Sequence, residues 1–359
     1  MPAKRATITD VATRAGVSKA TVSAVLNASA PVRSDTRDRV LHAVEFLDYR
    51  PGTGMGAAAA RAGTRRTVRS IGLLIKEADN PYYASVVTGA RAAAAGRGYT
   101  LLVASSEGEY ASERRAVELL HGKDCDGLLV APVLDDEVDL SHLFELKRRN
   151  YPFVLLEEVR GVPASLVDVD NVRGACAAAA HLIALGHTRI AHFAGPNYST
   201  HTHERVNGVR RACSASSVAF TDACVVPAGA HLEDGYRAAL AFFRDHPAGE
   251  RPTGVTCYND LIAVGVCRAL AELGVRVPDD VSVVGFDDIP LLEYLPVPLT
   301  SVHVPTFEMG RLATELLIAQ AEAAAPPAPQ KHFLDAPLIV RASTRPPAGA
   351  APRRRSPDV

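Results

Sequence analysis

The chain has 359 residues, 47% of them hydrophobic and 22% charged, which is typical of a globular protein with two or three domains. No stretch of 18 apolar residues indicates a membrane span, and residues 1–19 lack the apolar core of a secretion signal. The six cysteines show no C-x-x-C spacing and form no metal-site pattern with the histidines. We therefore expect a cytoplasmic protein with reduced thiols, no metal and no cofactor.

The net charge of −1 is unevenly distributed along the chain. Residues 1–70 hold 12 Lys and Arg against 5 Asp and Glu, a net charge of +7, which leaves −8 for the remainder. A basic end on an acidic body predicts that only the N-terminal end binds a polyanion.

The N-terminal residues have the pattern of a helix-turn-helix. Thr7 and Asp10 predict a capping box, Gly16 ends that first helix, and Ser18 caps a second helix. Apolar side chains of the two helices are expected to pack together: Val11, Ala12 and Ala15 against Val22, Val25 and Leu26. The outward face then holds Lys19, Ala20, Ser23, Ala24 and Asn27, and it suits a DNA major groove.

A third helix is expected over 34–47, followed by a basic, glycine-rich hinge. The alanine run 57–60 allows only a short helix, which is marginal by itself. We expect this hinge to order only against DNA and a dimer partner.

Beyond residue 70, short apolar runs alternate with helical patterns. Strands are expected over 71–75, 100–104, 127–131, 153–156, 189–193, 254–257 and 281–285. Helices are expected over 81–97, 111–121, 172–185, 205–215, 233–245 and 261–273. This alternation predicts an α/β fold with parallel sheets covered on both faces. Because one compact sheet cannot hold so many strands, we expect two lobes with a ligand cleft at the carboxyl ends of the strands.

An ordered set of motifs resembles the lactose-repressor (LacI/GalR) family over residues 7–343. The motifs are Asp10-Val11-Ala12, Gly16-Val17-Ser18, Thr21-Val22-Ser23, Leu26-Asn27, Tyr49-Arg50-Pro51, Asn80-Pro81-Tyr82-Tyr83, Leu185-Gly186-His187-Thr188-Arg189-Ile190, Tyr258-Asn259-Asp260 and Val283-Val284-Gly285-Phe286-Asp287-Asp288. The resemblance implies a homodimer or a dimer of dimers on a palindromic DNA operator, with a small-molecule effector in a cleft of periplasmic-binding-protein type. The absence of a C-terminal leucine heptad favours the dimer.

The resemblance also implies the domain boundaries. We expect an all-α headpiece over 1–50, a hinge over 51–70, a two-lobed effector and dimerisation domain over 71–343, and a disordered tail over 344–359. The first lobe is expected over 71–168 and 302–324, and the second over 169–300 and 328–343, with crossings near 169, 300 and 325. A loop over 323–329 would lead to a last strand over 337–341.

Family roles transfer to named positions of the headpiece and hinge. The resemblance implies that DNA contacts come from Thr7, Thr9, Ser18, Lys19, Ala20, Thr21, Ser23, Ala24 and Asn27. Ala24 departs from the arginine that is usual in the family, so the preferred operator should differ. The hinge departs as well, because the family's minor-groove leucine aligns best with Ala60. Either Met55 takes that role or the protein bends DNA less, while Arg61 can hold phosphates.

Several polar residues follow the expected strands and predict the effector site. The resemblance places effector contacts at Tyr82, Glu157, Arg205, Asn259 and Asp287. Carboxylates, an amide, a guanidinium and aromatic rings suit a sugar or sugar derivative; the alternative is a nucleobase, nucleoside or other metabolite. Simpler explanations remain: Asn259 and Asp287 or Asp288 can cap helices.

Two other classes of protein fit the sequence less well. The chain has no phosphate-binding P-loop and no nucleophile elbow, and the spacing of His201 and His203 favours a surface loop over a metal site. We therefore expect no catalytic residues. A solute-binding protein would resemble the larger part alone, but the DNA-binding head argues against it. The sequence predicts a ligand-responsive regulator, a repressor associated with the bacterial nucleoid.

Overall fold

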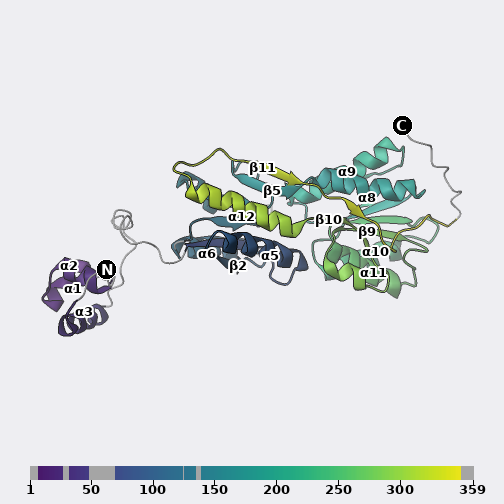
Figure 1. Cartoon of the computed structure of the whole chain (residues 1–359). Coiled ribbons are helices and arrows are strands. Elements are labelled where there is room, and N and C mark those ends of the chain that lie inside the picture. Colours follow the sequence, from purple (N-terminus) through teal and green to yellow (C-terminus); the bar gives the residue numbers. More distant parts are fainter. Residues whose placement is uncertain (1–6, 27–31, 48–68, 124, 135–138, 349–359) are drawn as a thin grey trace. The chain divides into compact units, whose positions relative to one another are not determined.

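The computed structural model describes residues 7–26, 32–47, 69–123, 125–134 and 139–348 (Figure 1). The chain divides into two compact units, Met1–Thr67 and Val68–Val359. In the described part of the smaller unit, three helices form: α1 (Ile8–Ala15), α2 (Lys19–Leu26) and α3 (Ser34–Phe46).

The caps expected for the small unit are present. Thr7 and Asp10 form a capping box at the start of α1, and Gly16 ends the helix with a φ of 63°. Ser18 Oγ accepts the Thr21 N–H, 3.1 Å away, and so caps α2. The core joins the expected apolar faces to residues from α3: Val11, Ala12, Ala15, Val22, Val25, Val40 and Ala43.

The larger unit is an α/β fold with two sheets, each six-stranded in the described part of the chain. The first has the order β11-β5-β4-β3-β1-β2, and every pair is parallel. Its strands are β1 (Arg69–Ile75), β2 (Tyr99–Ser105), β3 (Leu128–Val130), β4 (Phe153–Leu155), β5 (Ser165–Val169) and β11 (Lys331–Leu334). Helices α5 (Pro81–Gly96), α6 (Tyr110–Gly122), α7 (Ser141–Arg148) and α12 (Thr306–Glu322) belong to this first lobe.

The second sheet has the order β12-β10-β9-β8-β6-β7, in which only the edge strand β12 is antiparallel. Its strands are β6 (Ile190–Ala194), β7 (Val225–Pro227), β8 (Gly254–Cys257), β9 (Ser282–Asp287), β10 (Thr300–His303) and β12 (Leu338–Ile339). Helices α8 (Asn171–Ala184), α9 (Thr200–Ala215), α10 (Leu232–Asp245) and α11 (Asp260–Glu272) belong to the second lobe, as do the 3₁₀ turns Asp222–Cys224 and Pro290–Tyr294.

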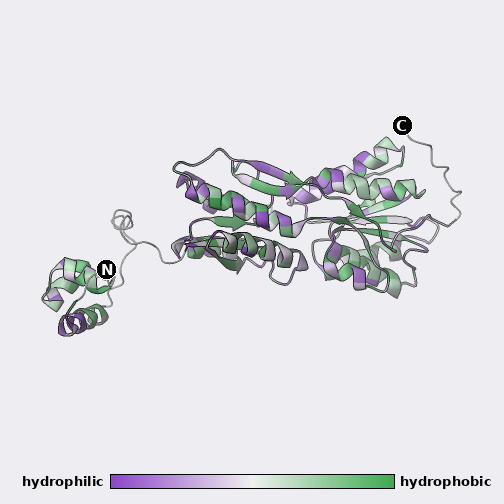
Figure 2. Cartoon of the chain, viewed as in Figure 1, coloured by the Kyte–Doolittle hydropathy of each residue, from purple (hydrophilic) through white to green (hydrophobic). Residues whose placement is uncertain are grey.

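Buried side chains connect the two lobes into one body. One apolar cluster runs from the first sheet, through α5 and α12, to α8, α9 and β9 of the second lobe. Separate clusters fill the other face of each sheet. Figure 2 shows helices with both hydrophobic and hydrophilic residues around more uniformly hydrophobic strands, as expected of sheets covered on both faces. None of the helices in the described residues meets the length and hydropathy needed to cross a membrane.

Two expected lobe boundaries in the C-terminal part were wrong, and one strand was missed. The segment Lys331–Leu334 pairs with β5 in the first sheet, although 328–343 was assigned to the second lobe. The strand β10 extends the second lobe to His303, so the crossings lie after Val169, after His303 and after Leu334. The edge strand β11 was missed because its exposure alternates and it has no apolar run.

The disordered tail was expected to begin at residue 344, but Thr344 and Arg345 are bonded to the second lobe. The Arg345 N–H donates to Ser282 Oγ at 3.0 Å, and the Arg345 carbonyl lies 2.9 Å from His187 Nε2. Thr344 Oγ1 lies 2.9 Å from His181 Nε2. These residues therefore pack on the second lobe; residues 349–359 lie outside the described part.

The close packing of α5 on α12 in the first lobe can be tested by substitution. A Cβ on Gly89 would lie 1.9 Å from the Phe307 carbonyl oxygen. We expect Gly89→Ala to destabilise the larger unit by about 1–3 kcal/mol through overpacking, measured as a lower midpoint of thermal unfolding. The control is Gly96→Ala in the same helix, where a Cβ meets nothing within 4 Å. Equal midpoints for the two variants would contradict this packing argument.

Candidate functional site

The predicted DNA-binding residues within the described part of the small unit lie at the start of α1 and along α2. Thr7, Thr9, Ser18, Lys19 and Ala20 are exposed, whereas Thr21, Ser23 and Ala24 are partly buried. Ser18 and Thr7 also cap helices, so their oxygens have a structural role. Asn27 and the hinge residues Met55, Ala60 and Arg61 lie outside the described residues.

Contacts from α3 keep this unit compact. The Arg39 guanidinium donates to the Ala15 carbonyl at the end of α1, with Nη2 at 2.6 Å and Nε at 3.2 Å. Arg14 lies over the Phe46 ring at 3.3 Å. Both basic side chains therefore fix helix packing, which leaves Lys19 as the exposed cation at the start of α2.

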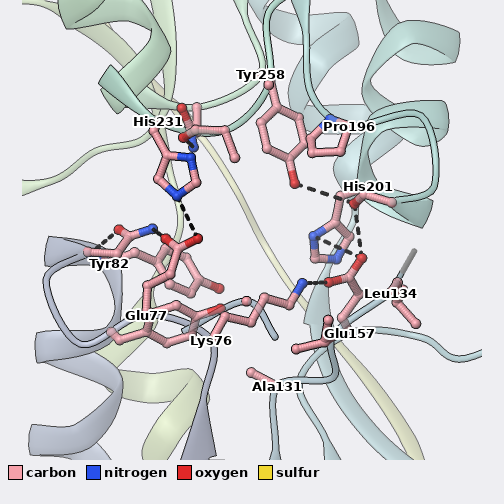
Figure 3. A pocket seen from close by; sticks show the side chains of 18 of the residues that line it. Lys76, Glu77, Tyr82, Ala131, Leu134, Glu157, Pro196, His201, His231 and Tyr258 are labelled. Carbon is pink, nitrogen blue, oxygen red and sulfur yellow. Dashed lines mark hydrogen bonds and ion pairs between the residues drawn. The ribbon is translucent and has the colours of Figure 1, made fainter. Parts of the chain in front are cut away.

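A cavity of about 430 Å³ lies between the two lobes of the larger unit (Figure 3). Its walls come from residues at or beyond the carboxyl ends of β1, β2, β3 and β4 in the first sheet and of β6, β7, β8 and β9 in the second. The carboxyl ends of both sheets thus meet at one cavity. All five residues expected to contact an effector line it: Tyr82, Glu157, Arg205, Asn259 and Asp287.

Buried charge pairs cross the floor of the cavity. Lys76 Nζ is paired with a Glu157 carboxylate oxygen, and Ser199 Oγ donates to the other oxygen at 3.0 Å. Burial alone would raise the pKa of Glu157, but His201, Lys76 and Ser199 hold it at about 2. Burial would likewise lower the pKa of Lys76, but Glu157 raises it well above its usual range. Both groups therefore stay charged.

Histidines from the second lobe bind carboxylates of the first lobe. His201 Nε2 lies 2.8 Å from Asp168 Oδ2, and His231 Nε2 lies 2.9 Å from Glu77 Oε1, as Figure 3 shows for the second pair. Burial opposes a charge on each imidazole, but the carboxylates raise the pKa of both histidines. Each pair therefore connects the two lobes, because its partners belong to elements of different lobes.

The position of His201 corrects an expectation. His201 and His203 were expected in a surface loop, but α9 begins at Thr200, five residues before the expected start. His201 faces the cavity and its side chain is 12% exposed, whereas His203 is exposed on another side of the helix. No group of three metal-ligating side chains gathers within the described residues.

Arg205 and Asp287 face each other at the second lobe's side of the cavity. The Arg205 guanidinium lies 3.7 Å from the centre of the Phe286 ring, and its Nε donates to Asn171 Oδ1 at 2.9 Å. Its Nη1 lies 3.9 Å from Asp287 Oδ1, beyond hydrogen-bond distance. Burial raises the pKa of Asp287 to about 7, although Arg205 and His201 oppose the rise.

A strained turn aims the Asp287 side chain. Asp287 and Asp288 have φ values of 115° and 59°, which non-glycine residues rarely adopt. The buried Asp260 holds this turn by accepting the Ile289 N–H at 2.9 Å and Ser301 Oγ–H at 2.6 Å. Asp288 itself binds His303 and Arg341. Neither Asp287 nor Asp288 caps the following 3₁₀ turn.

Asn259 and Tyr82 line the cavity with part of their polar groups already bonded. Asn259 caps α11 by accepting the Ile262 N–H at 2.9 Å, and its Nδ2 donates to the Ala230 carbonyl at 2.8 Å. The Tyr82 hydroxyl donates to Met309 Sδ at 3.3 Å. The helix-capping explanation for Asn259 is thus present in the structure, and any ligand contact by Asn259 is additional.

Besides His201, sequence reasoning missed four residues that shape the cavity: Lys76, Glu77, Ser199 and His231. Lys76 and Glu77 directly follow β1, so the rule that ligands bind beyond strand ends was enough to find them. Ser199 and His231 precede α9 and α10, and no local pattern reveals that they meet carboxylates from the other lobe.

Both units of the chain match families of known proteins. Residues 7–52 match the model for bacterial regulatory proteins of the lacI family, and residues 179–344 match that for a periplasmic binding protein-like domain. The repressor PurR of Photobacterium profundum is 33% identical over 318 residues, which cover 88% of this chain and 92% of PurR. The chain belongs to the LacI family.

Solved LacI-family structures resemble this chain over nearly its whole length. The complex of the transcriptional regulator CelR with cellobiose has a TM-score of 0.70 and 31% identity, covering 94% of this chain and all of that one. The lac repressor dimer bound to operator and the anti-inducer ONPF has a TM-score of 0.67 and 25% identity, covering 95% of this chain and all of that one. The chain is therefore a ligand-responsive transcriptional repressor and not an enzyme.

The histidine pairs predict that closure of the lobes weakens as pH rises. A histidine whose pKa is raised by a partner contributes fully below its ordinary value of 6.5 and loses that contribution as pH rises through the raised pKa. In Glu77→Gln we expect the pKa of His231 to fall, as measured by NMR titration of its ring protons. Hydrogen exchange near Ser199 should increase between pH 6 and pH 8.5 in the unchanged protein, after correction for intrinsic rates.

The matched control for this titration is Glu118→Gln, which removes a carboxylate paired with Arg114 on α6. It should leave the His231 titration unchanged. An unshifted His231 pKa in Glu77→Gln would mean that this pair does not form in solution.

Proposed function

We propose that the effector is a sugar or sugar derivative held in the cavity between the lobes. Its contacts would come from Tyr82, Glu157, Arg205, Asn259 and Asp287. The geometry of Arg205 and Asp287 carries the proposal, since the 3.9 Å separation leaves their direct hydrogen bond unmade. An effector hydroxyl can accept from the guanidinium and donate to the carboxylate, which satisfies both buried groups at once.

The cavity's size and composition support this proposal. Its volume of about 430 Å³ falls within the usual range for small-molecule sites. Tyrosines 82, 83, 198 and 258 line it and can cover the apolar faces of a sugar ring. CelR with cellobiose and an Enterococcus faecium LacI-family regulator with ribose are among the similar structures, and both hold sugars.

The second candidate is a nucleobase or nucleoside, which the PurR relatives favour. Several PurR repressors are 33–34% identical to this chain over 87–88% of its length. The same tyrosines can stack on a planar base, and Asp287 with Arg205 can bind its ring nitrogens and oxygens. The two candidates therefore compete for one cavity, and a panel holding both classes separates them.

The proposed response is a shift in the population of lobe arrangements. An effector that contacts both sheets binds the closed arrangement more tightly and so increases its share. Lobe positions in a dimer determine whether two headpieces reach both half-sites of a palindrome, so effector and operator affinities are coupled. We propose that this takes place on the chromosome in the bacterial cytoplasm.

Arg205→Ala tests the proposed effector site. We expect effector affinity to fall about 10–100-fold, because a hydrogen bond to a charged group contributes about 1.5–3 kcal/mol. Operator affinity without effector should stay near that of the unchanged protein. The measurement is binding of a fluorescent operator, obtained by selection from random duplexes, across a panel of sugars and nucleobases.

Asp287→Asn serves as the second variant, since it keeps the size of the side chain and removes the acceptor charge. It should reduce effector affinity and leave operator affinity unchanged. An undiminished effector response in both variants would remove the Arg205–Asp287 pair from the site.

Lys19→Ala tests the proposed DNA contact. Lys19 is exposed at the first position of α2, where a base-reading side chain contributes about 1–3 kcal/mol. We expect operator affinity to fall about 5–100-fold, measured by binding titration. Relaxed discrimination at one base pair would indicate base contact, whereas a uniform loss with a weaker salt dependence would indicate phosphate contact. Unchanged affinity would show that Lys19 is only solvated.

A further inference from the structure

The basic side chains of the cavity are all engaged by groups of the protein itself. Among the described residues, the lining includes four basic side chains, Lys76, His201, Arg205 and His231. Lys76 is paired with Glu157, and His201 lies 2.8 Å from Asp168. His231 lies 2.9 Å from Glu77 and 3.1 Å from Asp234.

Arg205 is the remaining basic side chain, and its donors are largely used. Its Nε donates to Asn171 and its Nη1 to the Tyr258 carbonyl, while Asp287 lies 3.9 Å from Nη1. A phosphate or carboxylate bound here would lie beside the Asp287 carboxyl group. Asp287 would have to stay protonated beside a bound anion, and Nε and Nη1 of Arg205 already have acceptors, so Arg205 is a poor anion clamp.

Helix N-termini at the cavity are also occupied. Backbone N–H groups at such termini are ordinary anion-binding sites, but three of those facing the cavity are capped from within. Asn80 accepts the Tyr82 N–H of α5 at 3.1 Å, and Asn259 accepts the Ile262 N–H of α11 at 2.9 Å. Asp234 accepts the N–H groups of Ala230 and His231 before α10 at 3.3 and 3.0 Å.

The start of α9 is shielded by a carboxylate instead. Ser199, which precedes α9, donates its hydroxyl to Glu157 Oε1 at 3.0 Å. An anion approaching this end of α9 would meet the Glu157 carboxylate, whose side chain is only 3% exposed. To bind that anion, Lys76 would have to leave Glu157 as a buried charge without its cation, which is strongly unfavourable.

The acidic side chains outnumber the basic ones. The described lining contains five carboxyl groups, Glu77, Glu107, Glu157, Asp234 and Asp287, against four basic groups. Asp168, which holds His201, adds a further carboxylate just behind the wall.

We infer that the effector is an uncharged molecule, and that this cavity rejects sugar phosphates, sugar acids and nucleotides. The inference rests on the proposed function in using the same cavity, but it holds equally for a neutral sugar and a neutral nucleobase. Selection against anions arises because the protein's own carboxylates already hold the cations that a phosphate needs.

The test compares uncharged compounds with their phosphorylated forms on the full-length protein. Calorimetric titration uses glucose with glucose 6-phosphate, ribose with ribose 5-phosphate, guanine with GMP, and inorganic phosphate alone. We expect the uncharged member of any responding pair to bind at least tenfold more tightly, and inorganic phosphate to show no saturable binding. Tighter binding of a phosphorylated member, or saturable phosphate binding that Lys76→Met abolishes, overturns the inference.

A gain-of-binding variant makes the test independent of effector identity. Glu157→Gln frees Lys76 and should create saturable binding of inorganic phosphate, with an affinity at least tenfold above that of the unchanged protein. The matched control is Glu107→Gln, which removes an exposed carboxylate from the same lining without releasing Lys76. Equal phosphate affinities in the two variants would show that the pairing of Lys76 does not control charge selection.

Outcomes for the two proposals are distinguishable. A response to guanine and to no sugar overturns the sugar proposal and leaves the charge inference intact. A response to a sugar phosphate in preference to its parent sugar overturns the charge inference and leaves the proposal of a sugar derivative intact.

Discussion

Pairing of buried charges across the two lobes is the constraint on which the rest of the cavity depends. Lys76 and Glu157 are paired within the first lobe. From the second lobe, Ser199 binds the Glu157 carboxylate and His201 binds Asp168. Separating the lobes would expose these contacts to water, and removing one partner would leave a buried charge unpaired. The same pairs therefore define the cavity floor, connect the lobes and set which ligand charges are tolerated.

Strain in the backbone completes the site at its other end. The positive φ values of Asp287 and Asp288 are maintained by Asp260 below the turn and by His303 and Arg341 beside it. His303 ends β10 and Arg341 follows β12, so this anchor lies next to two of the crossings between lobes. A ligand that engages Asp287 acts on a turn tied directly to the segments that must bend when the lobes move.

Family membership and the chain's own residues answer different questions. The relatives establish a transcriptional repressor with a lacI-family headpiece and a periplasmic-binding-protein-like domain. Neither the family model nor the relatives' names decide which ligand enters the cavity, because sugar-bound regulators and PurR repressors resemble this chain to a similar degree. Discrimination between effectors is a property of the side chains that line this cavity, since function resides in sites placed on a shared fold.

The sequence by itself determined the features that depend on neighbouring residues. Caps at Thr7, Gly16 and Ser18 are made within a few positions of the chain, and they appear where expected. Strand–helix alternation likewise predicted two lobes with a ligand cleft at the carboxyl ends of the strands, and the five effector residues implied by the family resemblance line that cavity.

Only the tertiary structure decided the pairings between distant residues. Glu77 and His231 are 154 positions apart, and Lys76 and Glu157 are 81 apart, so no local pattern could connect them. The edge strand β11 was lost for the same reason, because its place in the first sheet comes from pairing with β5 and not from its own apolar content. Local signals specify elements, whereas long-range charge pairing and strand order specify how those elements form a site.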